Sequence, residues 1–277
     1  NEGNSVALGR VDGIINGNNH KIANIKLESS SLMGNLYGEI RDLEIINFEQ
    51  EHDQGGLIVG AQSGSMIDNV HMSNVNIKMT GSGYSGGFFR YGNYSTITNS
   101  SITNINITVE REQTAYESYI GGIFGYGSST NVINCYVRNL NIINENATSA
   151  GTGGMVGIMW GFSTIENCYA EGNITSDAPN TGGIIGYADV LTIENCYAKV
   201  DIMSSNKYVG GIIGTYSNTS SIYSYNVNNN LSIGNLYTTE GEDTLDRITG
   251  NKRTFEAENY AYENQLINGY VDDEQLG

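Results

Sequence analysis

The chain has few basic residues: 13 Lys and Arg stand against 30 Asp and Glu, which gives a formal net charge of −17. Nucleic acids and anionic membrane surfaces are polyanions that would repel such a chain, so neither is expected as a partner. Long hydrophobic runs are also missing, because the 39% of hydrophobic residues occur in short bursts. No run approaches the about 20 apolar residues that cross a bilayer, so no membrane insertion is expected. The composition is typical of a soluble surface or secreted protein.

A starting methionine and a leader are missing as well. The first residue is Asn1, and no charged segment followed by an apolar segment comes after it. We therefore expect a piece of a longer chain, in which an export signal, an anchor or a catalytic domain would lie elsewhere.

Two markers recur along the 277 residues. The first is a Gly-Gly pair followed by an apolar pair, with copies 31, 35, 32, 29 and 28 residues apart: Gly55-Gly56, Gly86-Gly87, Gly121-Gly122, Gly153-Gly154, Gly182-Gly183 and Gly210-Gly211. The second follows 12 or 13 residues after each pair: Asn69, Asn99, Asn134, Asn167, Asn195 and, as an exception, Ser224. Both markers keep phase although the segments between them vary in length, which indicates structural repeats.

Weaker copies of the repeat lie at residues 11–27 and 31–48, so about eight units are predicted within residues 1–237. The pattern then stops. Residues 238–277 carry ten acidic and three basic residues and are predicted to form a capping segment or a linker to a downstream domain. Phe255, Tyr260 and Leu266 favour the cap, because linkers rarely display so much apolar surface.

Within a unit, apolar and polar residues alternate with a period of two, as in residues 168–174 and 196–202. This alternation predicts β-strands. In residues 66–77 and 132–142 the alternation slips by one residue in the middle, which predicts a bulge or corner. Each unit is therefore expected to hold two or three short strands with bends between them and no helix.

One such unit cannot bury its apolar side alone, whereas units stacked about 4.8 Å apart share a continuous core and pair their backbone groups. The predicted fold is all-β, a right-handed parallel β-helix of about eight coils with a non-repeat C-terminal tail. Coils in register would place like residues over one another. Three columns follow from this: asparagines (Asn134, Asn167, Asn195), inner cysteines (Cys135, Cys168, Cys196) and outer tyrosines (Tyr136, Tyr169, Tyr197).

The asparagines and cysteines are predicted to be a structural ladder. Each asparagine amide would donate to the next and satisfy backbone groups at a corner, while the thiols would be reduced apolar core groups. Zinc takes four ligands in a tetrahedron, but sulfurs on parallel strands lie in a line. A disulfide between neighbouring coils fits the parallel Cβ vectors poorly. We therefore expect no catalytic residue, metal site or cofactor in these residues.

Glu166 and Glu194 share one repeat position, so a pair of outer carboxylates about 5 Å apart is predicted. Enzymes that cleave sugars use paired acids. A solvated surface pair or a weak calcium site is favoured instead, because Thr98 and Ile133 stand in the same column. With the tyrosine column, the two glutamates form a candidate binding face for protein or sugar, although cross-strand stacking explains most tyrosines too. Other tyrosines could extend this face: Tyr187, Tyr208, Tyr216, Tyr223 and Tyr225.

The phrase GGIIGYADVLTIENCYA at residues 182–198 resembles the GLUG repeat of bacterial surface proteins, and this similarity covers most of residues 11–237. Residues 248–270 resemble the segment that follows the GLUG repeats in immunoglobulin A1 protease-type bacterial zinc metallopeptidases. That resemblance implies a peptidase domain with an H-E-x-x-H motif. The chain departs from it, because none of its histidines, His20, His52 and His71, lies in such a motif.

The resemblance therefore implies a non-catalytic, extracellular β-helix module that acts as a scaffold or as a binding region for substrate or host protein in a secreted or surface zinc metallopeptidase. Any zinc would lie outside this chain. The expected partners are a host protein such as immunoglobulin, or a glycan, and adjacent domains of the longer chain. The alternatives are a β-helix adhesin without an attached enzyme and, third, a carbohydrate-active β-helix enzyme. An H-E-x-x-H helix beyond Gly277 would separate the first two readings.

Overall fold

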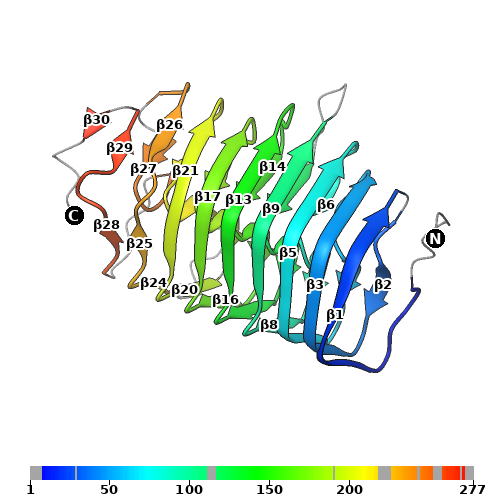
Figure 1. Ribbon diagram of the computed structural model, residues 1–277. Helices are drawn as coiled ribbons and strands as arrows, with labels where there is room; N and C mark the ends of the chain where they lie inside the picture. The colour runs from blue at the N-terminus through cyan, green and yellow to red at the C-terminus, as the bar shows by residue number, and fades with distance from the viewer. Residues whose placement is uncertain are drawn as a thin grey trace.

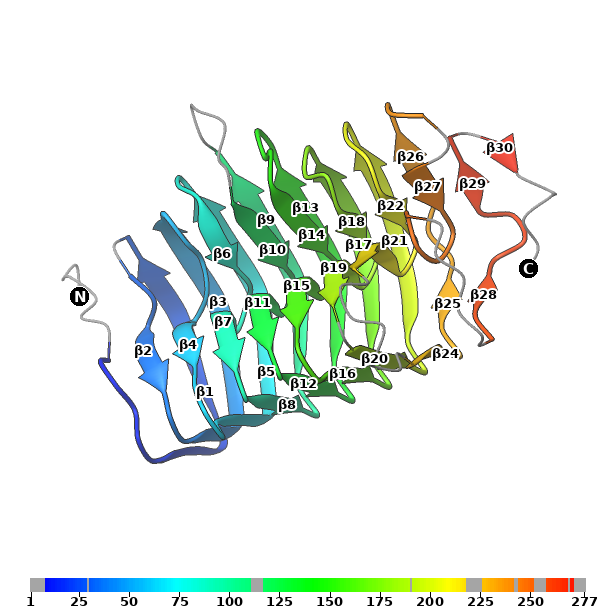
Figure 2. The same ribbon diagram turned by 180° about the vertical axis from the view of Figure 1, so that it is seen from behind.

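The computed structural model describes residues 8–28, 30–110, 117–189, 191–217, 226–241, 244–251, 258–268 and 270–271. Within these residues the chain winds as a right-handed parallel β-helix (Figures 1 and 2). The predicted all-β fold and its handedness are confirmed. None of the described residues belongs to a helix long and apolar enough to cross a membrane.

Three sheets run along the axis in the described part of the chain. Sheet I has 17 strands: β1 (Ile14–Leu27), β3 (Glu39–His52), β5 (Met66–Met79), β8 (Thr96–Thr98), β9 (Ser101–Val109), β12 (Asn131–Ile133), β13 (Tyr136–Asn144), β16 (Ser163–Glu166), β17 (Tyr169–Ser176), β20 (Leu191–Glu194), β21 (Tyr197–Ser204), β24 (Asn226–Asn228), β25 (Leu231–Ser232), β26 (Leu236–Thr238), β28 (Tyr260–Ala261), β29 (Leu266–Ile267) and β30 (Tyr270–Val271).

The other two sheets form the back of the coil (Figure 2). Sheet II contains β6 (Gly83–Ser85), β10 (Ser118–Gly121), β14 (Ala150–Gly153), β18 (Thr181–Gly182), β22 (Val209–Gly210) and β27 (Leu245–Asp246). Sheet III contains β2 (Met33–Leu36), β4 (Ile58–Ala61), β7 (Phe89–Asn93), β11 (Phe124–Ser128), β15 (Val156–Trp160), β19 (Ile185–Asp189) and β23 (Ile213–Ser217).

The described residues form about seven turns, so the prediction of eight coils was slightly too high. The difference lies at the N-terminal end. Residues 8–27, which include the first weak repeat, supply β1, but toward sheet III they make only two isolated bridges, Leu8 to Met33 and Val11 to Leu36. That repeat therefore completes one face of a coil and not the whole turn.

The Gly-Gly pairs lie where sheets II and III meet at a sharp corner. Neither Gly153 nor Gly154 has a left-handed φ angle, so this copy of the corner does not need glycine for its backbone conformation. The requirement is space. A Cβ on Gly154 would lie 2.1 Å from the carbonyl oxygen of Gly183 and 2.8 Å from Cβ of Ala170. Four of the six motifs have a third glycine that packs in the same way: a Cβ on Gly157, for example, would lie 2.5 Å from the backbone nitrogen of Ile120 in sheet II.

The asparagine of the second marker forms a different corner, between the two strands of sheet I in each coil. Asn134, Asn167 and Asn195 have φ angles of 55°, 53° and 55°, in the left-handed region. Asparagine tolerates this region better than most residues because its short polar side chain bonds locally. The alternation slip predicted in residues 66–77 and 132–142 has the same cause, since Asn74 and Asn139 have φ angles of 55° and 52°.

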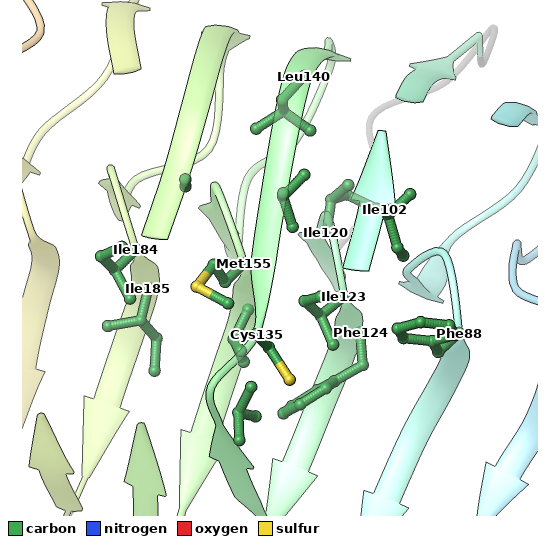
Figure 3. Close-up of a cluster of buried hydrophobic side chains, with 14 of the residues drawn as sticks. Phe88, Ile102, Ile120, Ile123, Phe124, Cys135, Leu140, Met155, Ile184 and Ile185 are labelled. Carbon is green, nitrogen blue, oxygen red and sulfur yellow. The ribbon is translucent and has the colours of Figure 1, made fainter. Parts of the chain in front are cut away.

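The core is a continuous column of apolar side chains inside the coils (Figure 3). Ile123, Phe124 and Met155 come from successive corners and are fully buried. Aromatic rings also stack within the core, with the centroids of Phe89 and Phe124 4.8 Å apart. Burial of this column stabilises the coils by the hydrophobic effect, at about 25 cal/mol for each Å² of apolar surface removed from water.

The C-terminal residues continue the stack. Strands β27, β28 and β29 pair in parallel with β22, β25 and β26, and β30 then pairs antiparallel with β29. Gln265 is fully buried, and its side-chain amide donates to the hydroxyl of Ser232 at 2.8 Å. Phe255 lies outside the described residues. The boundary at residue 237 stays a prediction.

Asn167→Ala is expected to lower the free energy of unfolding by about 1 kcal/mol, because alanine has no side-chain bond to offset a left-handed backbone. Asn167→Gly should keep most of that energy, since glycine adopts this conformation freely and the asparagine amide is exposed. Urea unfolding of both variants measures the difference. Equal losses would mean that the side-chain amide, and not the backbone conformation, is what this position supplies.

Candidate functional site

The predicted asparagine column is only partly joined by hydrogen bonds. The amide of Asn167 donates to Oδ1 of Asn134 at 3.3 Å, and the amide of Asn134 donates to Asn99 at 3.2 Å. Among the described residues, no hydrogen bond joins the side-chain amides of Asn195 and Asn167, although the amide of Asn229 donates to Oδ1 of Asn195 at 2.6 Å. Ser224, the exception in the column, lies outside the described residues.

A more regular asparagine ladder lies one corner further along sheet I, and sequence reasoning missed it. Each amide donates to the asparagine of the preceding coil at 2.8 or 2.9 Å, through Asn24, Asn47, Asn74, Asn104 and Asn139. A shorter ladder runs beside it through Asn76, Asn106 and Asn141. The signal was present in the sequence as the triplets NVN, NIN and NLN at residues 74–76, 104–106 and 139–141.

The three cysteines are free and buried. They are also hydrogen-bonded, so the interpretation as purely apolar groups is incomplete. Sγ of Cys168 accepts the backbone N–H of Cys135 at 3.3 Å and donates to the carbonyl oxygen of Glu166 at 3.0 Å. Ser100 and Asn230 stand at the equivalent positions of other coils and accept the backbone N–H groups of Val70 and Cys196.

The environment of Cys135 and Cys168 keeps their thiols protonated. A hydrogen bond with Cys168, and then burial, raises the pKa of Cys135 well above its ordinary value of 9.0. Burial raises the pKa of Cys168 far above that value too. Because the thiolate is the reactive and metal-binding form, both side chains are chemically inert at neutral pH. Within the described residues, no group of three or more His, Cys, Asp or Glu side chains is placed to hold a metal ion.

The predicted tyrosine column is a stack of parallel rings on the outer side of sheet I. The ring centroids of Tyr136 and Tyr169 are 4.9 Å apart and those of Tyr169 and Tyr197 are 4.7 Å apart, with 4° between the planes in each pair. Arg138 lies beside the stack, with its guanidinium carbon 5.6 Å and 5.5 Å from the first two centroids. It donates to the hydroxyl of Tyr169 at 2.6 Å.

Charged neighbours continue this surface. Glu171 forms an ion pair with Lys199 at 3.1 Å and another with Arg138 at 3.5 Å, and all three side chains are partly exposed. Burial raises the pKa of Tyr169, although Arg138 opposes this effect, and burial also raises the pKa of Tyr197. Both hydroxyls are therefore protonated at neutral pH and can donate to a ligand. We name the side chains of Tyr136, Tyr169, Tyr197, Arg138, Glu171 and Lys199 the tyrosine face.

Glu166 and Glu194 lie on the neighbouring strands β16 and β20, directly opposite each other in the register. The amide of Asn167 donates to Glu166 at 3.4 Å, and that of Asn226 donates to Glu194. Their column continues to Ile133 and Thr98, so no third carboxylate adjoins the pair there. Amide hydrogen bonds to both carboxylates fit the reading as a surface pair.

Three of the other candidate tyrosines lie away from the tyrosine face. Tyr216 is 2% exposed and belongs to the core. Tyr187 lies on sheet III, where it packs against Trp160 with the centroids 5.4 Å apart. Tyr208 has a left-handed φ angle of 58° and lies just before β22 of sheet II. The expectation that Tyr216 belongs to an exposed binding face was therefore wrong. Tyr223 and Tyr225 lie outside the described residues.

Sheets, glycine corners and side-chain columns together define a right-handed parallel β-helix, and one of its repeats matches a known sequence family. The family model of the GLUG motif matches residues 148–175, which include the corner at Gly153 and Gly154 and the Asn167–Cys168–Tyr169 step. The predicted resemblance is confirmed there.

The crystal structure of a candidate immunoglobulin A1 protease from Bacteroides ovatus is similar to this chain, with 19% sequence identity and a TM-score of 0.49. The match covers 91% of this chain and 67% of that protein. A comparison with curated proteins found no match.

Proposed function

We propose that this chain is a non-catalytic, extracellular β-helix module that binds a host protein through the tyrosine face. It would serve a larger secreted or surface protein of the zinc metallopeptidase type, with any zinc held outside this chain. The sequence resemblance supports this class, since the GLUG repeat and the segment at residues 248–270 both resemble parts of such proteins.

One observation carries the proposal: three parallel tyrosine rings stand at coil spacing on one sheet, and Arg138 lies beside two of them. Tyrosine supplies amphipathic contact area with little loss of conformational entropy, and tyrosine and arginine are enriched among residues that dominate binding energy. The strands beneath the rings pair on both sides, so the rings are held in place before a ligand arrives.

Purified immunoglobulin A1 is the probe, chosen for the family that the sequence resembles. We expect it to bind the immobilised chain in surface plasmon resonance, and Tyr169→Ala to weaken binding at least tenfold, because the central ring contacts both neighbours. Tyr37→Ala is the matched control, since Tyr37 is also an exposed tyrosine beneath an arginine, with the guanidinium carbon of Arg10 4.0 Å from its ring centroid. It should bind like the wild type.

Thermal unfolding of each variant shows whether it is folded. Lack of binding by the wild-type chain, or equal binding by wild type and folded Tyr169→Ala, would refute the proposal.

A further inference from the structure

A groove of about 610 Å³ opens on the outer side of sheet I, directly beside the tyrosine face. Glu171 and Lys199 belong to both surfaces. The groove spans strands β13, β17 and β21 and reaches the C-terminal segment at Tyr262 (Figure 1 shows these strands side by side). It is therefore continuous with the surface to which the proposed function assigns binding.

The groove forms where a bulge is present in β13 and absent from the neighbouring strand β17. Asn139 is the last left-handed asparagine of the regular ladder, and the register between β13 and β17 shifts just there. In the next coil Gly172 packs on the backbone, where a Cβ would lie 2.1 Å from the carbonyl oxygen of Leu140. Gly234 repeats this packing against Val200 with a distance of 2.0 Å. Two positions without side chains leave a hollow between rows of polar residues.

Asparagine amides and two carboxylates make up most of the polar lining of the groove. The amides of Asn139 and Asn141 donate to the preceding coil, at 2.9 and 2.7 Å, which leaves their carbonyl oxygens toward the groove side of the ladders. Asp201 adds a carboxylate, one oxygen of which accepts the backbone N–H of Asn235 at 2.7 Å. Asn173 lies between Asn141 and Asp201 in the register, and its side chain is exposed. A matching ligand must offer several hydrogen-bonding groups within a short length.

Other ligand classes fit poorly. An extended peptide binds by adding a strand at a free sheet edge, but β17 is paired with β13 and β21 on its two sides. A polyanion would meet a chain of net charge −17, and the groove's Lys199 is already paired with Glu171. A neutral sugar needs neither a free strand edge nor a positively charged surface. Its hydroxyl groups can donate to the carbonyl and carboxylate oxygens, while its C–H groups can pack on Ile233 and the half-exposed ring of Tyr262.

We infer that this groove binds a neutral oligosaccharide. The inference deepens the proposed function and rests on it: the sugar would be a glycan carried by the protein that docks on the tyrosine face. The two surfaces would then act together, since the tyrosine face binds the host protein and the groove binds the glycan that this host protein carries.

The test uses isothermal titration calorimetry of the full chain with three neutral probes: maltotetraose, mannotetraose and an N-acetyllactosamine tetrasaccharide. We expect at least one to bind. Asn173→Trp, which fills the groove from an exposed position, should abolish that binding, and Asn173→Ala should weaken it at least tenfold. The matched control is Asn76→Ala, which removes a side chain from the same asparagine row several coils away and should bind like the wild type.

Binding of no probe, or binding that Asn173→Trp leaves unchanged, would overturn the inference. Failure of the proposed function gives a different result, which is measured by testing the binding of enzymatically deglycosylated immunoglobulin A1 to the chain. In one outcome the deglycosylated immunoglobulin A1 still binds the chain, Tyr169→Ala abolishes this binding, and no sugar binds. The proposed role of the tyrosine face is then supported and the groove assignment is refuted. If a sugar binds in an Asn173-dependent way and neither form of immunoglobulin A1 binds, the groove assignment stands and the proposed protein partner falls.

Discussion

Gly154→Ala is expected to lower the free energy of unfolding by about 3 kcal/mol or more, as overpacking of a closely packed site does. The new Cβ would lie 2.1 Å from the carbonyl oxygen of Gly183 in the next coil. That coil cannot move away, because Gly183 is packed equally closely against Gly211. A single methyl group therefore has to separate coils whose spacing is set by backbone hydrogen bonds.

Urea unfolding followed by circular dichroism measures this loss, and Gly241→Ala provides the control. Apart from its chain neighbours, no atom of the described residues lies within 4 Å of a Cβ at Gly241, so that variant should unfold within about 0.5 kcal/mol of the wild type. Similar midpoints for the two variants would show that close approach is not why the motif contains glycine.

The sequence was enough to predict the coil, because each repeat carries two independent markers. The register places Tyr136, Tyr169 and Tyr197 opposite one another, and each of them follows the asparagine of the second marker by two residues. A one-residue error would turn every side chain of a strand to the other face. Alternation along the strand and phase between the repeats therefore lead to the same alignment.

The groove could not be predicted in the same way, although its cause is visible in the sequence. Alternation slips in residues 132–142 and is regular in residues 168–174, so one bulge residue is present in the first segment and absent from the second. The consequence appears only when the two strands lie side by side, with Gly172 against Leu140. Side chains on either side of such a step come from different repeats, and no motif within one repeat records them.

The hydrogen bonds of the cysteine column were likewise out of reach from the sequence. Burial of a small residue at this corner was predictable, but the corner also leaves a backbone N–H without a strand partner. The side chain one coil further on accepts it, as Cys168 does for Cys135. Ser100 and Asn230 at equivalent positions share with cysteine a small polar atom, which explains why these three residue types stand there.

Cys168→Val is therefore expected to lower the free energy of unfolding by about 2 kcal/mol. Valine fills a similar space, but it leaves the backbone N–H of Cys135 buried without an acceptor, and an unpaired buried donor costs about 1 to 3 kcal/mol. It also removes the thiol that donates to the carbonyl oxygen of Glu166.

Cys168→Ser separates this effect from that of simple packing. Ser100 already makes both contacts in its own coil, since it accepts the N–H of Val70 at 3.0 Å and donates to the carbonyl oxygen of Thr98 at 2.6 Å. Serine at residue 168 should therefore keep the stability within about 1 kcal/mol of the wild type, although it is more polar than valine. If urea unfolding instead ranks valine above serine, the column is held by its apolar volume, and the backbone N–H of Cys135 does not need the sulfur.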